Sequence, residues 1–113
     1  VPGARPLDTF DVIVRGSQRV LSLCAERGAA DVLLVSSGAV YGRQPASLPR
    51  MDEDHAGAPG LGDVRDGYGH GKRCAEWMAA AAAAAGGVAP RVARCCRARA
   101  PTPSIRGRSS GRI

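Results

Sequence analysis

Apolar residues recur at steps of three and four from Asp8 to Arg27. This spacing places them on one side of a helix, so the pattern predicts an amphipathic helix with one buried stripe. Asp8 or Thr9 is expected to cap its start, and Gly28 is expected to follow its end. Gly16 lies inside this helix and costs roughly 1 kcal/mol relative to alanine, which indicates a close packing contact at that position.

Three further segments have patterns of their own. Residues Asp31–Ser37 contain a short run of β-branched and leucine residues without alternation that ends in two serines, typical of a parallel strand covered on both faces. Residues Tyr68–Ala85 are rich in alanine, contain no proline and precede two glycines, which predicts a second helix. Val88–Cys95 reads as a second strand. Residues 42–67 are rich in Gly, Pro and Asp and form a long loop, a kind of segment that is usually functional or mobile.

The order helix, strand, long loop, helix and strand predicts a βαβ unit with one helix in front of it. The expected fold class is therefore α/β, as part of a Rossmann-like doubly wound parallel sheet. With 113 residues the chain is one domain at most. Two strands do not close a core, and the sequence starts at Val1 rather than Met, so we expect a fragment whose upstream part is missing.

The formal net charge of +6 comes from the end of the chain. Residues 97–113 hold five arginines and no acidic residue, whereas the charges before them nearly balance. The folded part therefore gives no indication of a nucleic-acid-binding surface. The four cysteines lack metal-ligand spacing and no secretory segment precedes them, which favours reduced thiols in the cytoplasm. No apolar run approaches ~20 residues, so no membrane span is expected.

Three side chains have the chemistry of an acid/base site. Tyr68 and Lys72 are four residues apart, which places them on one face of the second helix. Ser37 ends the first strand, at the carboxyl edge where open α/β sheets bind their ligands. The ammonium stabilises a phenolate, and the hydroxyl steadies a developing alkoxide by hydrogen bonding. Such a set suits reversible oxidation of a secondary alcohol, with hydride leaving to a nicotinamide.

A Tyr-x-x-x-Lys motif alone often occurs by chance, and a tyrosine at a helix start usually serves packing, so the order of several motifs carries more weight. Residues 35–42 (Val-Ser-Ser-Gly-Ala-Val-Tyr-Gly) are followed by residues 68–72 (Tyr-Gly-His-Gly-Lys) and then by Ala-Glu at 75–76. Together they resemble the extended short-chain dehydrogenase/reductase family, the NAD-dependent epimerase/dehydratases. The resemblance covers about residues 8–95.

The resemblance implies a role for each of four residues. Tyr68 would be the catalytic acid/base and would also contact the cofactor. Lys72 would assist it in catalysis by lowering its pKa and would bind the nicotinamide ribose. Ser37 would be the catalytic partner of the substrate oxygen. Ser36 would line the nicotinamide pocket mainly through its backbone. The implied function is that of an NAD(P)-dependent nucleotide-sugar epimerase/dehydratase-type oxidoreductase, with NAD or NADP as cofactor, a nucleotide-sugar-like small-molecule substrate and a homodimer in the intact family.

The sequence also departs from the family pattern. The dinucleotide-binding fingerprint Gly-x-x-Gly-x-x-Gly does not occur in this sequence, so the sequence supplies no binding site for the cofactor pyrophosphate. Ile13 stands where the family often has asparagine. Gly38-Ala39 follow Ser37 where dehydratases carry Asp-Glu, which favours an epimerase or reductase.

These features divide the chain in two. Residues 1–95 are expected to form a partial NAD(P)-binding Rossmann-like domain with the serine and Tyr-x-x-x-Lys motifs. Residues 96–113 lack periodicity and are expected to be a disordered Arg-rich tail. One hypothesis for this tail is a shifted reading frame, and the alternative is a genuine basic extension. Two other functions stay open: a non-catalytic truncated product, and a small basic nucleic-acid-binding protein.

Overall fold

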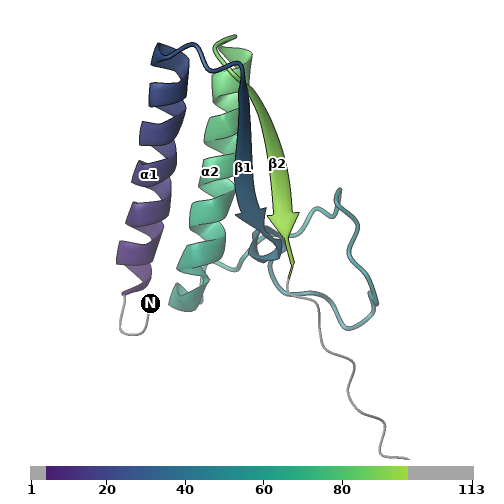
Figure 1. The fold of residues 1–113 in the computed structure, drawn as a ribbon. Coiled ribbons are helices and arrows are strands. Elements are labelled where there is room, and N and C mark those ends of the chain that lie inside the picture. The colour runs from purple at the N-terminus through teal and green to yellow at the C-terminus, as the bar shows by residue number, and fades with distance from the viewer. Residues whose placement is uncertain (1–4, 97–113) are drawn as a thin grey trace, which may run out of the picture.

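The computed structural model describes residues 5–96 of the chain. Two helices and two strands follow one another in the predicted order, and two short 3-10 turns, which were not predicted, lie between the first strand and the second helix (Figure 1). This order and the parallel sheet confirm the α/β fold class and the partial Rossmann-like architecture. The elements are α1 (Pro6–Glu26), β1 (Asp31–Ser37), η1 (Gly38–Tyr41), η2 (Val64–Asp66), α2 (Gly67–Ala84) and β2 (Ala89–Cys95).

The sheet has only one face covered by helix. Its two strands run parallel, from Asp31 opposite Ala89 to Ser37 opposite Cys95. α2 packs against both strands and against α1 (Figure 1). Leu33 and Val35 point to the other face and are 65% and 54% exposed. The expectation that β1 is covered on both faces is therefore wrong for this part of the chain, because neither described helix lies over that side.

α1 begins two residues earlier than the predicted caps. Pro6 opens it, and proline at a first helical position has the backbone angle that a helix needs. Arg5 is the N-cap residue, and its side chain pairs with Asp8 at 2.9 Å across the first turn. The predicted capping by Asp8 or Thr9 is wrong for this reason. Gly28 follows the end of the helix with a φ of 69°, as predicted.

Glycines inside the second motif let neighbouring segments approach α2. A Cβ on Gly71 would lie 3.3 Å from Ile13 of α1, and a Cβ on Gly69 would lie 2.8 Å from the carbonyl oxygen of Ala39. Both glycines are buried. Around Gly16, in contrast, none of residues 5–96 lies within 4 Å of a Cβ, so this part of the chain does not supply the predicted packing contact.

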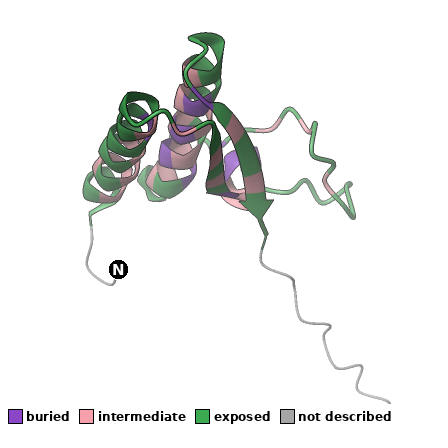
Figure 2. Cartoon of the chain, turned by 45° about the horizontal axis from the view of Figure 1, so that its top comes forward, coloured by how far each residue is buried: buried purple, intermediate pink, exposed green. Residues whose placement is uncertain are grey.

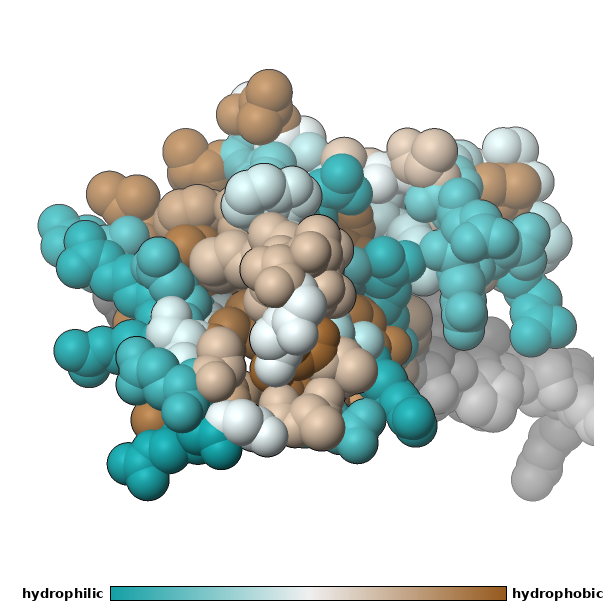
Figure 3. Space-filling model, turned by 90° about the horizontal axis from the view of Figure 1, so that it is seen from above, coloured by the Kyte–Doolittle hydropathy of each residue, from teal (hydrophilic) through white to brown (hydrophobic). Residues whose placement is uncertain are grey.

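The core is small. Figure 2 shows the buried residues gathered mainly along α2 and at η1. Apolar residues also reach the surface at the end of the molecule seen in Figure 3. Neither of the two helices is long and apolar enough to cross a membrane. The buried apolar residues of the described part are Leu21, Val40, Tyr41, Ala75, Ala79 and Val88.

We predict that the isolated 113-residue chain unfolds with weak thermal cooperativity. Each strand lacks a neighbour on one side within residues 5–96, and a core this small gives little stabilisation. Calorimetry should give a broad transition whose calorimetric and van't Hoff enthalpies differ. A sharp two-state transition at high temperature would contradict this prediction.

Candidate functional site

Tyr68 and Lys72 lie together in the first two turns of α2. The Nζ atom of Lys72 is 5.8 Å from the centre of the Tyr68 ring. Tyr68 is 44% exposed, so a ligand can reach its ring. Lys72 is also the only lysine in the chain, although the sequence holds sixteen Lys and Arg residues in total. A compact ammonium, rather than a guanidinium, therefore stands beside the Tyr68 ring.

The side chain of Lys72 connects α2 to β1. Its ammonium donates a hydrogen bond of 3.0 Å to the carbonyl oxygen of Val35, two residues before Ser37. The positive charge therefore lies between the Tyr68 ring and the carboxyl end of the strand.

Ser37 is the last residue of β1 and caps the turn η1. Its hydroxyl oxygen accepts a hydrogen bond of 3.1 Å from the amide of Ala39. The same residue lines a hollow of about 980 Å³ at the carboxyl ends of the strands, together with Tyr41, Arg50 and Cys95. This volume is in the range of small-molecule sites. Within residues 5–96, no hydrogen bond joins Ser37 to Tyr68 or Lys72.

Ser36 faces the helix layer instead. It is 3% exposed, and its hydroxyl has no hydrogen-bond partner of good geometry. The hydroxyl nevertheless contributes to lowering the pKa of the nearby Glu76 carboxyl. With the side chain turned inward, Ser36 pairs with β2 opposite Arg94, one residue before the carboxyl edge of the sheet.

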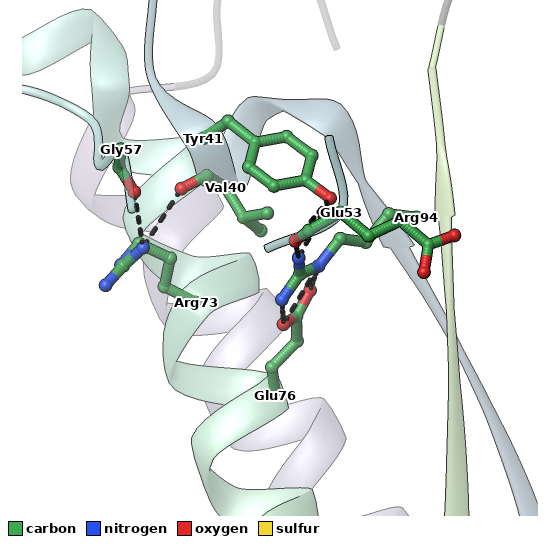
Figure 4. A network of polar contacts seen from close by, with 7 residues as sticks. All are labelled: Val40, Tyr41, Glu53, Gly57, Arg73, Glu76 and Arg94. Atoms are coloured by element: carbon green, nitrogen blue, oxygen red, sulfur yellow. Dashed lines mark hydrogen bonds and ion pairs between the residues drawn. The ribbon is translucent and has the colours of Figure 1, made fainter. Parts of the chain in front are cut away.

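The sequence analysis missed a polar network centred on Arg94 (Figure 4). The Arg94 guanidinium donates to both carboxylate oxygens of Glu76, with a shortest distance of 2.7 Å, and to the Tyr41 hydroxyl at 2.9 Å. It also donates to the carbonyl oxygen of Glu53 at 2.9 Å and lies 4.9 Å from the centre of the Tyr41 ring. One side chain of β2 thus ties together α2, η1 and the long loop.

A second arginine supports the same turn. Arg73 of α2 donates to the carbonyl oxygens of Val40 and Gly57, at 3.1 and 3.0 Å. The turn that follows Ser37 is therefore fixed to the helix that carries Tyr68. The Val-Tyr-Gly and Ala-Glu motifs contained two members of these networks, Tyr41 and Glu76, but their spacing along the chain gave no sign that they meet.

The electrostatics of the network favour its charged form. Burial raises the pKa of Glu76 and is the largest single influence on it, but the hydrogen bonds from Arg94 and Ser36 and the charges of Arg94 and Arg73 together hold that pKa below its ordinary value of 4.5. Hydrogen bonding to Glu76 likewise raises the pKa of Arg94. Away from the site, hydrogen bonds from Arg65 lower the pKa of Asp63 to about 2, and the Asp63 side chain also caps η2.

Metal chemistry has no support in this part of the chain. Among residues 5–96, no group of three or more His, Cys, Asp or Glu side chains is placed to hold a metal ion. The four cysteines are free.

The chain matches one family of known proteins. The model of the NAD dependent epimerase/dehydratase family matches residues 3–113. No curated protein matches the chain. The family match runs on to the end of the chain, but residues 97–113 lie outside the described residues. The disordered tail, its origin in a shifted reading frame and the alternative of a genuine basic extension therefore stay predictions.

We predict that Arg94→Met destabilises the fold by about 1–3 kcal/mol, because the carboxylate of Glu76 is left without its donors in a partly buried place. Urea titration followed by circular dichroism should show a lower midpoint. Arg5→Met is the matched control, since the side chains of the Arg5–Asp8 pair are 82% and 52% exposed and the pair should contribute less than about 1 kcal/mol. Equal shifts in the two variants would contradict the prediction.

The same network should give a dependence on pH. Because the folded-state pKa of Glu76 lies below the ordinary value of 4.5 expected in the unfolded chain, its carboxylate stabilises the fold above pH 4.5. This contribution declines as the pH falls below 4.5 and through the folded-state pKa. Urea midpoints measured across this range should fall less steeply in Glu76→Gln than in the unchanged chain. Parallel curves would show that another group controls the acid response.

Proposed function

Because the chain belongs to the NAD-dependent epimerase/dehydratase family, we propose that it carries the catalytic residues of an NAD(P)-dependent nucleotide-sugar epimerase/dehydratase-type oxidoreductase. The reaction is hydride transfer at a secondary alcohol. The observation that supports this most is the position of Lys72, whose ammonium lies 5.8 Å from the Tyr68 ring centre and bonds to β1 two residues before Ser37.

Each of the three side chains has its own task in this proposal. Tyr68 takes the proton of the substrate hydroxyl and returns it in the reverse direction. Lys72 stabilises the phenolate form of Tyr68, which is the form that accepts this proton, and the phenol so formed is the proton donor in the reverse direction. Ser37 donates a hydrogen bond to the substrate oxygen as negative charge grows there. The bound nicotinamide supplies the hydride acceptor or donor.

The described residues fit one end of such a cofactor. The Lys72 ammonium and the Tyr68 hydroxyl are donors suited to ribose hydroxyls, and the backbone of Ser36 lies at the same edge of the sheet. The pyrophosphate of the cofactor lacks its usual binding site, since the sequence contains no Gly-x-x-Gly-x-x-Gly turn. We therefore propose NAD or NADP as cofactor and expect tight binding only with a dinucleotide-binding half present.

The hollow beside Ser37 suits a polar small molecule. Arg50 lines it together with backbone groups of the turn after Ser37, and a guanidinium is a good partner for a phosphate of a nucleotide-sugar-like substrate. We propose an epimerase or reductase reaction here, a homodimer for the intact protein and a cytoplasmic location, the last because all four thiols are free.

Two alternatives remain distinct from this proposal. A truncated, non-catalytic product would keep the arrangement of Tyr68 and Lys72 but show no saturable binding of NAD, even with a dinucleotide-binding half present. A basic nucleic-acid-binding protein is suggested by the five arginines of residues 97–113. That function requires salt-dependent binding to DNA that is lost when these residues are removed.

We predict that the chain, joined downstream of a dinucleotide-binding half with the Gly-x-x-Gly-x-x-Gly turn, oxidises or epimerises a nucleotide-sugar and that Tyr68→Phe lowers kcat by about 10²–10⁴-fold. NAD should still bind, with a dissociation constant raised by no more than about tenfold, because Tyr68→Phe removes one neutral hydrogen bond to the ribose and keeps the Lys72 ammonium. Net oxidation is followed by the absorbance of the reduced nicotinamide, epimerisation by chromatographic separation of the two sugar epimers, and NAD binding by calorimetry. His70→Gln, on the same helix, is the matched control and should keep activity. Unchanged kcat in Tyr68→Phe would refute the assignment.

A further inference from the structure

The hollow beside Ser37 contains two thiols. Cys95 ends β2 and pairs with Ser37 across the sheet, and Cys96 follows it directly. Both cysteines are exposed and line the hollow, at the end of the molecule where the strands meet η1 (Figure 1). The other two cysteines, Cys24 of α1 and Cys74 of α2, are half-buried and lie elsewhere. The four thiols therefore differ in their access to a dissolved reagent.

Cys96 lies directly against the backbone of η1. A Cβ on Gly38, the first residue of η1, would lie 2.6 Å from the Sγ atom of Cys96, which is too close for a real Cβ. The glycine thus leaves room for the thiol. Since Ser37 directly precedes Gly38, a group attached to the Cys96 sulfur begins next to the turn that Ser37 caps.

The two neighbouring thiols are not suited to a disulfide with each other. Consecutive Cα atoms across a trans peptide are about 3.8 Å apart, whereas disulfides join Cα atoms that are about 4.4–6.8 Å apart. All four cysteines of the chain are free in this structure. Oxidation of Cys96 to a disulfide is therefore expected to use a sulfur from outside the chain.

The hollow favours a small, negatively charged partner. Its volume of about 980 Å³ is in the range of small-molecule sites. Arg50 is the charged residue among the described residues that line it, and no Asp or Glu is among them. A positive charge without an acidic neighbour raises the local concentration of anionic reagents. Glutathione disulfide is such a reagent, since its carboxylates outnumber its ammonium groups.

We propose that Cys96 is a modification site for an anionic low-molecular-weight disulfide of the glutathione class, and that the attached half fills the hollow. The Cys96 thiol releases its proton to water, and the thiolate attacks one sulfur of the disulfide. A bond forms between that sulfur and Cys96 while the bond between the two reagent sulfurs breaks. The leaving sulfur takes the electron pair and gains a proton from water. Cys96 is thereby oxidised and the leaving half reduced, and an excess of free thiol reverses the exchange.

The consequence of this modification for activity rests on the proposed function. In that proposal the hollow takes the nucleotide-sugar-like substrate. A group on Cys96 then keeps the substrate away from Ser37 until the mixed disulfide is reduced. The modification itself requires neither substrate nor nicotinamide.

The test treats the full 113-residue chain with glutathione disulfide and follows each cysteine by peptide mapping and mass spectrometry. Cys96 should react at least about tenfold faster than the half-buried Cys24 and Cys74. Cys95→Ser is the matched variant and should keep the fast reaction, whereas Cys96→Ser should lose it. Equal rates at the four thiols, a fast reaction that persists in Cys96→Ser, or a disulfide-linked dimer as the main product would each overturn the site.

The charge preference is measured with a second reagent. Cystamine is a disulfide with a positive charge at each end, so the ratio of the two reaction rates at Cys96 reports the electrostatic preference. Arg50→Gln should lower the preference for glutathione disulfide by about threefold at low salt. Arg15→Gln removes the same charge from a residue of α1 that does not line the hollow, and it should leave the ratio unchanged. Equal changes in the two variants would contradict the choice of an anionic partner.

Occupation of the hollow is measured at Arg50. In the chain modified at Cys96, the reaction of Arg50 with phenylglyoxal should slow by about threefold, because a glutathione carboxylate pairs with the guanidinium. The reaction of Arg15 should not change. An unchanged rate at Arg50 would show that the attached group points to solvent and would overturn the filling of the hollow.

These outcomes are separate from those of the proposed function. The experiments contain no nicotinamide and no sugar, so their failure leaves the proposed function standing. A completed protein that binds no NAD, while Cys96 reacts as expected, would refute only the proposed function.

Discussion

The hydrogen bonds of the Arg94 guanidinium hold the functional end of this fold together. They reach a carboxylate on α2, a phenol on η1 and a backbone carbonyl in the long loop. A planar group with several donors suits this task, because it satisfies partners in different directions at once. Since Glu76 lies one turn beyond Lys72 on α2, the network also fixes the helical face that carries the acid/base pair relative to the turn after Ser37.

Small side chains make this arrangement possible. At Gly69 the backbone of Ala39 comes close to α2, and at Gly71 the side chain of Ile13 does. Larger residues there would push η1 or α1 away from the helix and with them the end of β1. The Tyr-x-x-x-Lys motif therefore combines two kinds of requirement: chemistry at its first and last positions, and close packing at the glycines between them.

The spacing of apolar and polar residues along the chain predicted much of the fold. It could not predict which residues from distant segments contact one another. The strand Asp31–Ser37 was predicted with its observed bounds, and the shared face of Tyr68 and Lys72 follows from helical spacing alone. The start of α1 was missed because Pro6 begins the helix before the polar residues that could have capped it. The role of Arg94 was missed because its partners lie 18 to 53 residues away, where no spacing rule applies. The uncovered face of β1 was missed because a continuous apolar run has the same appearance whether or not both sides find a partner.

That uncovered face has a consequence for the life of the polypeptide in a cell. Leu33 and Val35 present large apolar side chains to water on a strand whose backbone edge is also open. Surfaces of this kind attract chaperones and nucleate β-aggregates, and proteases remove chains that stay marginally folded. For the isolated chain, the segment around Leu33 and Val35 is therefore where β-aggregation should begin.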